Sequence, residues 1–330
     1  MNKLPKVLIT TIPFGEKNPL PLKLLQNSGI EYLINPFNKK ITEDQLSEII
    51  SDFDVIIAGT EPITEKVLNS ATNLKLISRV GIGLDSVDLL AAQKRGIKVS
   101  YTPDAPSLAV VELTIGLMLS LLRSVHVSNM QMHRGEWHRI FGKRLKEVKV
   151  GIIGVGRIGK RVLKSLKGFG ASKILANDIE QNHELENEYN LEWTSKEKIY
   201  KEADVISLHI PLTHLTKNMI RKEHLIKMKH DALIINTSRG GIINENDLYE
   251  VMLSGHLSGA AIDVFEIEPY DGPLKEIERC LLTSHMGSMS VDCRSRMEIE
   301  STEESIRFLS GKALEREVPK EEYDLRSQGL

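Results

Sequence analysis

Short apolar runs alternate with amphipathic helical stretches along almost the whole chain of 330 residues. In the first hundred residues, β-branched runs predict strands at 7–12, 31–34, 55–58, 76–80 and 97–101. Apolar positions three and four apart predict helices at 21–27, 43–50, 65–69 and 86–94, with Thr42 and Thr64 as N-caps. This alternation with short connections indicates a parallel sheet covered by helices on both faces.

The alternation resumes in the second half of the chain after an interruption. Two prolines within 101–106 break the pattern, a long apolar helix is expected at 108–125, and 132–144 reads as basic and irregular. Later strands are predicted at 150–153, 173–176, 205–210, 233–235, 259–264 and 281–283, and helices at 158–168, 225–229, 247–253 and 291–310. The polar tail at 320–330 is expected to be loose.

The most distinctive stretch begins where the strand at 150–153 ends. It runs into a G-x-G-x-x-G turn made by Gly154, Gly156 and Gly159, and a helix follows. Gly154 permits a tight turn, Gly156 lets a pyrophosphate approach the backbone, and Gly159 lets the helix pack close to the strand. Asp178 ends the next strand, where a carboxylate can accept hydrogen bonds from ribose hydroxyls and repel a 2′-phosphate. A glycine-rich turn without a ligand is the alternative, but the order of elements favours an NAD site.

Length and composition narrow the class of protein. A chain of 330 residues exceeds one comfortable core, so two domains are expected. The net charge of −2 and the lack of a basic tract give no case for nucleic acid. The start lacks the apolar region of a signal peptide, and the most apolar segment, 113–122, is about half the length that spans a bilayer. Cys280 and Cys293 are too few for a disulfide framework and too distant for a metal site, so a cytoplasmic protein without a metal is expected.

The position of the glycine turn suggests how the domains are arranged. Because it lies mid-chain, the cofactor domain, 104–287, is expected to be inserted into a discontinuous substrate domain made of 1–103 and 288–330. Long helices near 105–125 and 288–310 are expected to cross between the domains and leave a cleft.

Three charged or titratable side chains follow strands in the cofactor domain. Arg239 follows 233–235, Glu268 follows 259–264, and His285 follows 281–283. A guanidinium can hold a carboxylate and a carbonyl in a planar fork, an imidazolium can protonate a carbonyl oxygen as hydride arrives, and a carboxylate can fix the imidazole. The set suits reduction of a 2-oxo acid, although each residue taken alone could be structural. In the first hundred residues, the loop Val80–Gly83 has closely spaced glycines whose N–H groups could hold a small anion.

At these residues the chain resembles the D-isomer-specific 2-hydroxyacid dehydrogenases, a family that includes D-3-phosphoglycerate dehydrogenase. The matching stretches occur in the family's order and read RVGIGLDSVDLLAAQKRGIKVSYTP, VVELTIGLMLSLLR, GIIGVGRIGK, INTSRGGIINENDL, GAAIDVFEIEP and LLTSHMGS. The resemblance implies two doubly wound parallel-sheet α/β domains with a cleft between them. One is a flavodoxin-like substrate domain, and the other is an inserted Rossmann NAD-binding domain. It also implies a homodimer formed through the cofactor domain.

The resemblance assigns roles to individual residues. Arg239 orients the substrate, His285 is the acid/base and Glu268 is its partner, while Asp263 holds the nicotinamide carboxamide. Further cofactor contacts are implied at Arg157, Ile158, Thr237, Ser238, Gly287 and Ser288, beside Gly154, Gly156, Gly159 and Asp178. His209 could line the adenosine side, although a core role is favoured. The substrate carboxylate is expected at Val80, Gly81, Ile82 and Gly83, with Arg79 on the same strand.

Two departures from the family pattern affect this interpretation. Ser284 precedes the histidine where the family usually has proline. The arginine that phosphoglycerate dehydrogenases use for the phosphate is replaced near Ala58 and Gly59, with acidic Glu61 close by. Arg79 or Arg139 could still bind a phosphate, so a phosphorylated substrate stays open. The alternatives are an NADH-responsive, non-catalytic corepressor-like protein and a phosphite dehydrogenase. A formate dehydrogenase is weaker, because that branch typically has glutamine at the Glu268 position.

Overall fold

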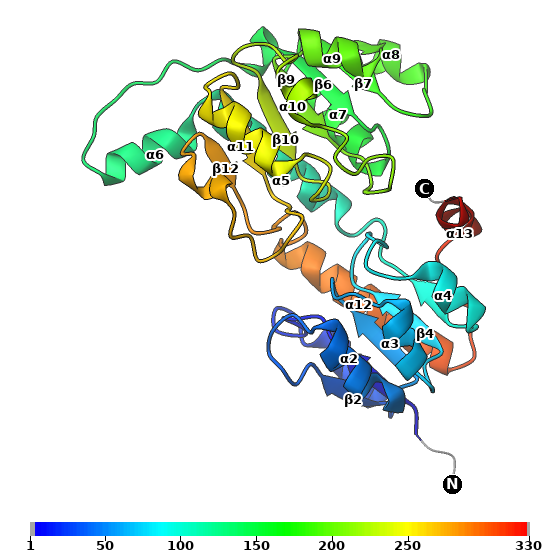
Figure 1. The fold of residues 1–330 in the computed structure, drawn as a ribbon. Coiled ribbons are helices and arrows are strands. Elements are labelled where there is room, and N and C mark those ends of the chain that lie inside the picture. The colour runs from blue at the N-terminus through cyan, green and yellow to red at the C-terminus, as the bar shows by residue number, and fades with distance from the viewer. Residues whose placement is uncertain (1–3, 329–330) are drawn as a thin grey trace. The chain divides into compact units, whose positions relative to one another are not determined.

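A computed structural model describes residues 4–328 of the chain and divides them between two compact units. Unit 1 consists of Met1–Pro106 with Ser288–Leu330, and unit 2 is Ser107–Gly287. Residues 1–3 and 329–330, which include the end of the expected loose tail, lie outside the described part. Each unit is built on its own parallel sheet (Figure 1).

The sheet of unit 1 has the order β2-β1-β3-β4-β5 over residues 4–328. Its strands are β1 (Lys6–Ile9), β2 (Glu31–Ile34), β3 (Val55–Ala58), β4 (Leu76–Arg79) and β5 (Lys98–Ser100). All neighbours are parallel, and every residue of β3 and β4 is buried, as expected for central strands covered on both faces. The expected strand at 7–12 ends earlier, because Ile12–Pro13 follows in a turn.

Helices cover both faces of this sheet. They are α1 (Leu20–Asn27), α2 (Glu43–Ile49), the 3₁₀ turn Ile50–Asp52, α3 (Glu65–Ser70), α4 (Leu89–Lys94), α12 (Val291–Leu309) and α13 (Lys320–Ser327). Thr42 and Thr64 accept hydrogen bonds from the backbone N–H groups of Gln45 and Val67, so both predicted N-caps are confirmed. The long helix α12 packs on β3, β4 and α1, and Ser78 donates to the Ser301 carbonyl at 2.9 Å.

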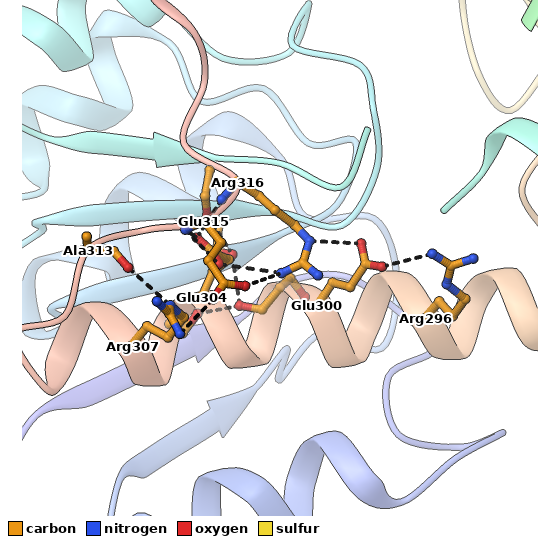
Figure 2. Close-up of polar contacts among 11 residues, drawn as sticks. Arg296, Glu300, Glu304, Arg307, Ala313, Glu315 and Arg316 are labelled. Carbon is orange, nitrogen blue, oxygen red and sulfur yellow. Dashed lines mark hydrogen bonds and ion pairs between the residues drawn. The ribbon is translucent and has the colours of Figure 1, made fainter. Parts of the chain in front are cut away.

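The C-terminal segment of unit 1 is fastened to α12 by the ion pairs shown in Figure 2, and it is also bonded to the sheet edge. Arg316 lies 3.4 Å from Glu300 and 3.6 Å from buried Glu304, and the N–H groups of Glu315 and Arg316 donate to Glu304. Next to this network, Val318 donates to the Val99 carbonyl and covers the open edge of β5.

The loose tail expected at 320–330 is therefore wrong over its described residues. Helix α13 occupies Lys320–Ser327 and contacts α4, and Tyr323 packs against the core of unit 1. The tail looked loose because its composition is polar, whereas its order comes from partners far away in the sequence.

The sheet of unit 2 has the order β12-β11-β10-β9-β6-β7-β8 over the described residues, again with parallel neighbours. Its strands are β6 (Lys149–Ile153), β7 (Lys173–Asn177), β8 (Leu191–Trp193), β9 (Val205–Leu208), β10 (Leu233–Asn236), β11 (Gly259–Ile262) and β12 (Cys280–Leu282). The strand order reverses at β6, which places its glycine turn at the edge where dinucleotides bind in such sheets.

Two apolar clusters cover the two faces of this sheet. The helices and 3₁₀ turns are α5 (Ser107–Leu122), α6 (Val125–His133), Leu145–Glu147, α7 (Arg157–Gly168), α8 (Glu184–Tyr189), α9 (Lys196–Glu202), α10 (Lys222–Leu225), α11 (Glu245–Leu253) and Pro273–Glu276. Elements α8, β8 and α9 were not expected from the sequence, and α10 begins earlier than the predicted helix at 225–229. Their polar composition hides them, since each buries only one or two side chains.

Helix α6 and the loop after it form an arm that extends from the rest of unit 2 (Figure 1). The sequence predicted one helix over 108–125, but the chain bends at Ser124, whose φ is 49°, and continues as α6. The helix has no buried residue, and every residue from 132 to 144 is exposed. No single helix of residues 4–328 is long and apolar enough to cross a membrane, although α5 and α6 together pass by length and composition despite a bend of 66°.

Candidate active site

The glycine turn after β6 leaves no room for side chains at two of its three positions. A Cβ on Gly154 would lie 2.4 Å from the His209 carbonyl oxygen, and Gly154 has a φ of +95°. A Cβ on Gly159 would lie 2.1 Å from the Gly154 carbonyl oxygen, whereas one on Gly156 would meet nothing within 4 Å. Gly154 and Gly159 are thus required by the fold itself. Gly156 keeps open the space that a ligand would fill.

The first turn of α7 faces this space with its backbone N–H groups. Gly156 is the N-cap and supplies no side-chain hydrogen bond, and no acidic residue lies in the first turn. Arg157 and Ile158 begin the helix, the former exposed and the latter half-buried. Because the start of a helix carries partial positive charge, this end of α7 suits a pyrophosphate.

Asp178 lies beside the glycine turn at the end of β7. It accepts hydrogen bonds from the N–H groups of Val155 and Glu180. It also lines a hollow of 540 Å³, together with Lys160, Trp193 and the residues of the 180–185 segment. The hollow, the half-buried carboxylate and the open position at Gly156 fit an NAD molecule, whose ribose Asp178 would hold. A 2′-phosphate would meet the carboxylates of Asp178 and Glu180.

His209 lies directly beneath the glycine turn. Its backbone N–H donates to Ile153 at 2.7 Å, and its Nε2 lies 2.9 Å from the Ser207 hydroxyl. Burial lowers the pKa of the His209 imidazole to about 4, so the ring is neutral near pH 7. The contacts describe a ring that supports the turn, while its expected cofactor contact stays a prediction.

Arg239 projects from a tight turn after β10. Buried Asn236 holds this turn, since its amide donates to the Arg239 carbonyl at 2.8 Å and its oxygen accepts from the Ser238 N–H and hydroxyl. Thr237 lies 2.8 Å from Thr114 of α5, hydroxyl to hydroxyl. The arginine backbone is therefore fixed before any substrate arrives.

Asp263 organises the turn that carries His285. One carboxylate oxygen accepts from the Thr283 hydroxyl at 2.6 Å and the Met286 N–H at 2.7 Å, and the other accepts from the Gly287 N–H at 2.9 Å. His285 has a φ of 53°, a left-handed conformation that is rare outside glycine. The sequence assigned Asp263 to the cofactor carboxamide. The structure shows in addition that this fully buried carboxylate shapes the histidine turn.

His285 and Glu268 form a direct pair. The Nδ1 atom of His285 lies 2.9 and 3.0 Å from the two oxygens of Glu268, and the Phe265 N–H donates to the same carboxylate at 3.1 Å. Both side chains are partly exposed. With Nδ1 facing Glu268, the ring presents Nε2 for proton transfer.

In unit 1, the loop Val80–Gly83 was expected to bind an anion through its N–H groups, but two of these groups donate hydrogen bonds to internal acceptors. The Val80 N–H donates to the Ala58 carbonyl, and the Gly81 N–H donates to the Thr102 hydroxyl. Val80 and Gly81 are thus not donors to a substrate in this structure, which corrects the expectation. Within the described part of the chain, the N–H groups of Ile82 and Gly83 have no acceptor.

Arg79 and Glu61 lie inside unit 1 rather than on its surface. The Arg79 guanidinium donates to the Gly83 carbonyl at 2.9 and 3.1 Å and to the Ala58 carbonyl at 3.1 Å, so it holds the loop. Glu61 accepts twice from the Gly59 N–H, at 3.1 Å to each oxygen, and once from the Thr10 hydroxyl. Both side chains are nearly inaccessible, at 4% and 3% exposure. Ser288 belongs to unit 1 as well, and its expected cofactor contact stays a prediction.

Comparison with known proteins agrees with this geometry. The sequence model described as "D-isomer specific 2-hydroxyacid dehydrogenase, NAD binding domain" matches residues 115–287, just over half of the chain. The chain belongs to the D-isomer specific 2-hydroxyacid dehydrogenase family. It is an NAD-dependent oxidoreductase that acts on 2-hydroxy acids.

Three relatives of this D-isomer specific 2-hydroxyacid dehydrogenase illustrate the range of activities for which similar proteins are named. Hydroxypyruvate reductase of Thermotoga maritima is 36% identical over 300 residues, covering 86% of this chain and 96% of that protein. D-3-phosphoglycerate dehydrogenase of Methanocaldococcus jannaschii is 37% identical over 287 residues, covering 84% of this chain but 54% of that protein. The solved D-lactate dehydrogenase of Aquifex aeolicus, complexed with NAD and lactic acid, is 25% identical with a TM-score of 0.82, covering 93% and 96% of the two chains.

The family, the α/β fold with two parallel sheets and the NAD cofactor predicted from the sequence are confirmed. Sequence reasoning missed the supporting residues Asn236 and Thr283. Both are polar residues at the end of an apolar strand, and that position was the signal that could have identified them.

Proposed function

We propose that the enzyme reduces a small, unphosphorylated 2-oxo acid to the D-2-hydroxy acid with NADH. The observation that carries this proposal is the His285–Glu268 pair, held at 2.9 Å on a turn that Asp263 fixes. When bound, NADH supplies the hydride for C2 of the substrate.

The side chains divide the remaining work. Arg239 grips the substrate carboxylate and carbonyl in a planar fork. His285 donates the proton at Nε2 to the carbonyl oxygen, and Glu268 stabilises the imidazolium and fixes its orientation. In the reverse direction His285 takes the proton back.

The choice of an unphosphorylated substrate rests on the charges in unit 1. Glu61 places a buried carboxylate at the end of β3, and Arg79 is engaged with carbonyl oxygens. Arg294 of α12 is also committed, since it donates to Thr11 at 2.8 Å and pairs with Glu298 at 2.6 Å. A phosphate dianion at this edge would approach a carboxylate with no uncommitted guanidinium from these residues. The hydroxypyruvate reductase relative supports the same class.

The test is NADH oxidation with glyoxylate, pyruvate and hydroxypyruvate, using the wild type and two variants. We expect His285→Ala to lower kcat by about 10²–10⁴-fold, the usual contribution of a general acid. Arg239→Ala should lower kcat/KM by at least about 10²-fold, since a charge-assisted, two-pronged hydrogen bond to the substrate is lost. Glu250→Ala, an exposed acid on α11, is the control. Wild-type turnover in both site variants would contradict the mechanism.

We also propose that the enzyme is a homodimer formed through the arm of residues 125–144. The arm exposes Val125, Met132, Trp137, Ile140 and Phe141, with Phe141 at 102% exposure. Val125 and Met132 lie on α6, which has no buried residue, and Trp137, Ile140 and Phe141 lie in the exposed loop after it. Exposed apolar side chains gathered on one segment are typical of an interface. Light scattering should give twice the mass of one chain, and Trp137→Ser with Phe141→Ser should give monomers. A monomeric wild type would overturn the proposal.

We further propose that the enzyme is cytoplasmic, and cell fractionation tests this location.

A further inference from the structure

Helix α11 begins directly after the turn that carries Arg239. Asn244 caps the helix by accepting the Asp247 N–H at 3.0 Å, and Glu245 is its first residue. The Glu245 side chain is half-buried. Its Oε1 accepts the Glu266 backbone N–H at 2.7 Å. The segment that leads to Glu268 is therefore tied to the start of α11.

Gly240 packs closely against the same segment. A Cβ on Gly240 would lie 2.0 Å from the Phe265 carbonyl carbon and 2.5 Å from the Glu266 nitrogen, so the two backbones touch. The segment then closes on itself, because the Phe265 N–H donates to Glu268 at 3.1 Å. Gly240 and Glu245, which are five residues apart in the chain, thus both contact the Phe265–Glu266 backbone that leads to Glu268.

We propose that Glu245 is a positioning residue for the Glu268–His285 pair, acting through the Glu266 N–H. This inference rests on the proposed function, since it needs that pair to be the site of proton transfer. The stretch from Arg239 to Glu245 then carries the substrate-orienting cation at one end and the support of the acid/base pair at the other. A shift of α11 would move both together.

The charge of Glu245 also acts on the pair. Burial raises the pKa of the Glu245 carboxyl; the Glu266 N–H opposes this, and the carboxylates of Glu266 and Glu268 add to it. Lys217 faces the same cluster and lies 3.2 Å from Glu266. Tyr270 also faces it: burial raises the pKa of its phenol, and Glu245 adds to this rise. When ionised, Glu245 adds negative charge near Glu268, the partner of His285.

The experiment compares Glu245→Ala, Glu245→Gln and the control Glu250→Ala in the full-length enzyme, with NADH and the best 2-oxo acid. Glu245→Ala removes the acceptor, so we expect kcat to fall about 10-fold with KM changed less than about 2-fold. Glu245→Gln keeps an oxygen acceptor, so we expect kcat to recover to within about 3-fold of the wild type. Without the negative charge, the alkaline limb of its pH–rate profile should move about 0.5 pH unit lower.

Thermal melts and the His285→Ala variant distinguish a failure of the inference about Glu245 from a failure of the proposed function. If Glu245→Ala keeps wild-type kcat while His285→Ala is inactive, the inference about Glu245 is wrong and the proposed function stands. If His285→Ala stays active, the proposed function fails. Equal losses in both Glu245 variants, with an unmoved pH profile and lowered Tm, would mean a merely structural role and would also overturn the inference.

Discussion

The carboxyl ends of the two parallel sheets are built in opposite ways. In unit 2, β6 runs into a glycine turn, and α7 starts at Gly156 without a side-chain cap. In unit 1, β3 ends where the Glu61 carboxylate accepts the Gly59 N–H, and β4 ends where Arg79 donates to backbone carbonyls. Both edges belong to fully parallel sheets, and they differ in which donors are satisfied internally.

The difference shows how the carboxyl end of a parallel sheet can either attract or repel an anionic ligand. Backbone donors without an internal acceptor, aligned at the start of a helix, attract the pyrophosphate of a dinucleotide. Donors that already face a buried carboxylate leave no such field, and the carboxylate repels a second anion. The specificity of each edge therefore depends on a few residues after the strands rather than on the sheet.

Replacing the glycines of the unit 2 turn should have the largest effect. Gly159→Ala forces a Cβ against the Gly154 carbonyl oxygen, so we expect about 3 kcal/mol or more of lost stability. Gly156→Ala meets nothing within 4 Å, so its Tm should stay within about 2 °C while NADH binds at least about 10-fold more weakly. Thermal melts and NADH fluorescence titration measure both. Tight NADH binding by Gly156→Ala would contradict an open ligand position.

The neutral imidazole beneath the turn makes a pH-dependent contribution. The folded-state pKa of His209 is lowered to about 4 from its ordinary 6.5, so the neutral form stabilises the fold fully above pH 6.5. This stabilisation is lost as pH falls from 6.5 towards 4, by about 2 kcal/mol between pH 7 and pH 5. His209→Asn should weaken the pH dependence of urea unfolding by that amount. Equal pH dependence in both proteins would show that the histidine is not the group responsible.

Removing the acid beside the glycine turn should have the smallest effect of the three. Asp178→Ser removes a carboxylate from the hollow but leaves Glu180 on its rim. We expect the preference for NADH over NADPH, taken as the ratio of kcat/KM values, to fall about 10-fold, or about 1.4 kcal/mol. An unchanged ratio would place the discrimination elsewhere, and Glu180→Ser then becomes the decisive variant.

The sequence predicted those features of the fold and site that depend on local patterns. Apolar runs located most central strands, because a buried parallel strand must be apolar on both faces. Gly154, Gly156 and Gly159 could be interpreted one by one, since the demand for a missing Cβ is a local property. Arg239 and His285 were found because parallel strands deliver the residues after them to one edge.

What the sequence could not predict depends on partners distant in the chain. The order of α13 depends on Tyr323 packing against the core of unit 1. The commitment of Arg79 to Gly83 and Ala58, and that of Asp263 to the turn at His285, arise from which side chain reaches which backbone group. Residue type alone predicted a substrate contact for Arg79, and only the hydrogen bonds identify its structural use.

The most direct test of the account is the ratio of kcat/KM for hydroxypyruvate to that for 3-phosphohydroxypyruvate, measured with NADH on the wild-type enzyme. Because Glu61 is acidic and Arg79 is engaged inside unit 1, we predict a ratio of at least about 10², which corresponds to about 2.7 kcal/mol of discrimination. A ratio below one would contradict the account, since it would require the unit 1 edge to attract the phosphate that its buried carboxylate should repel.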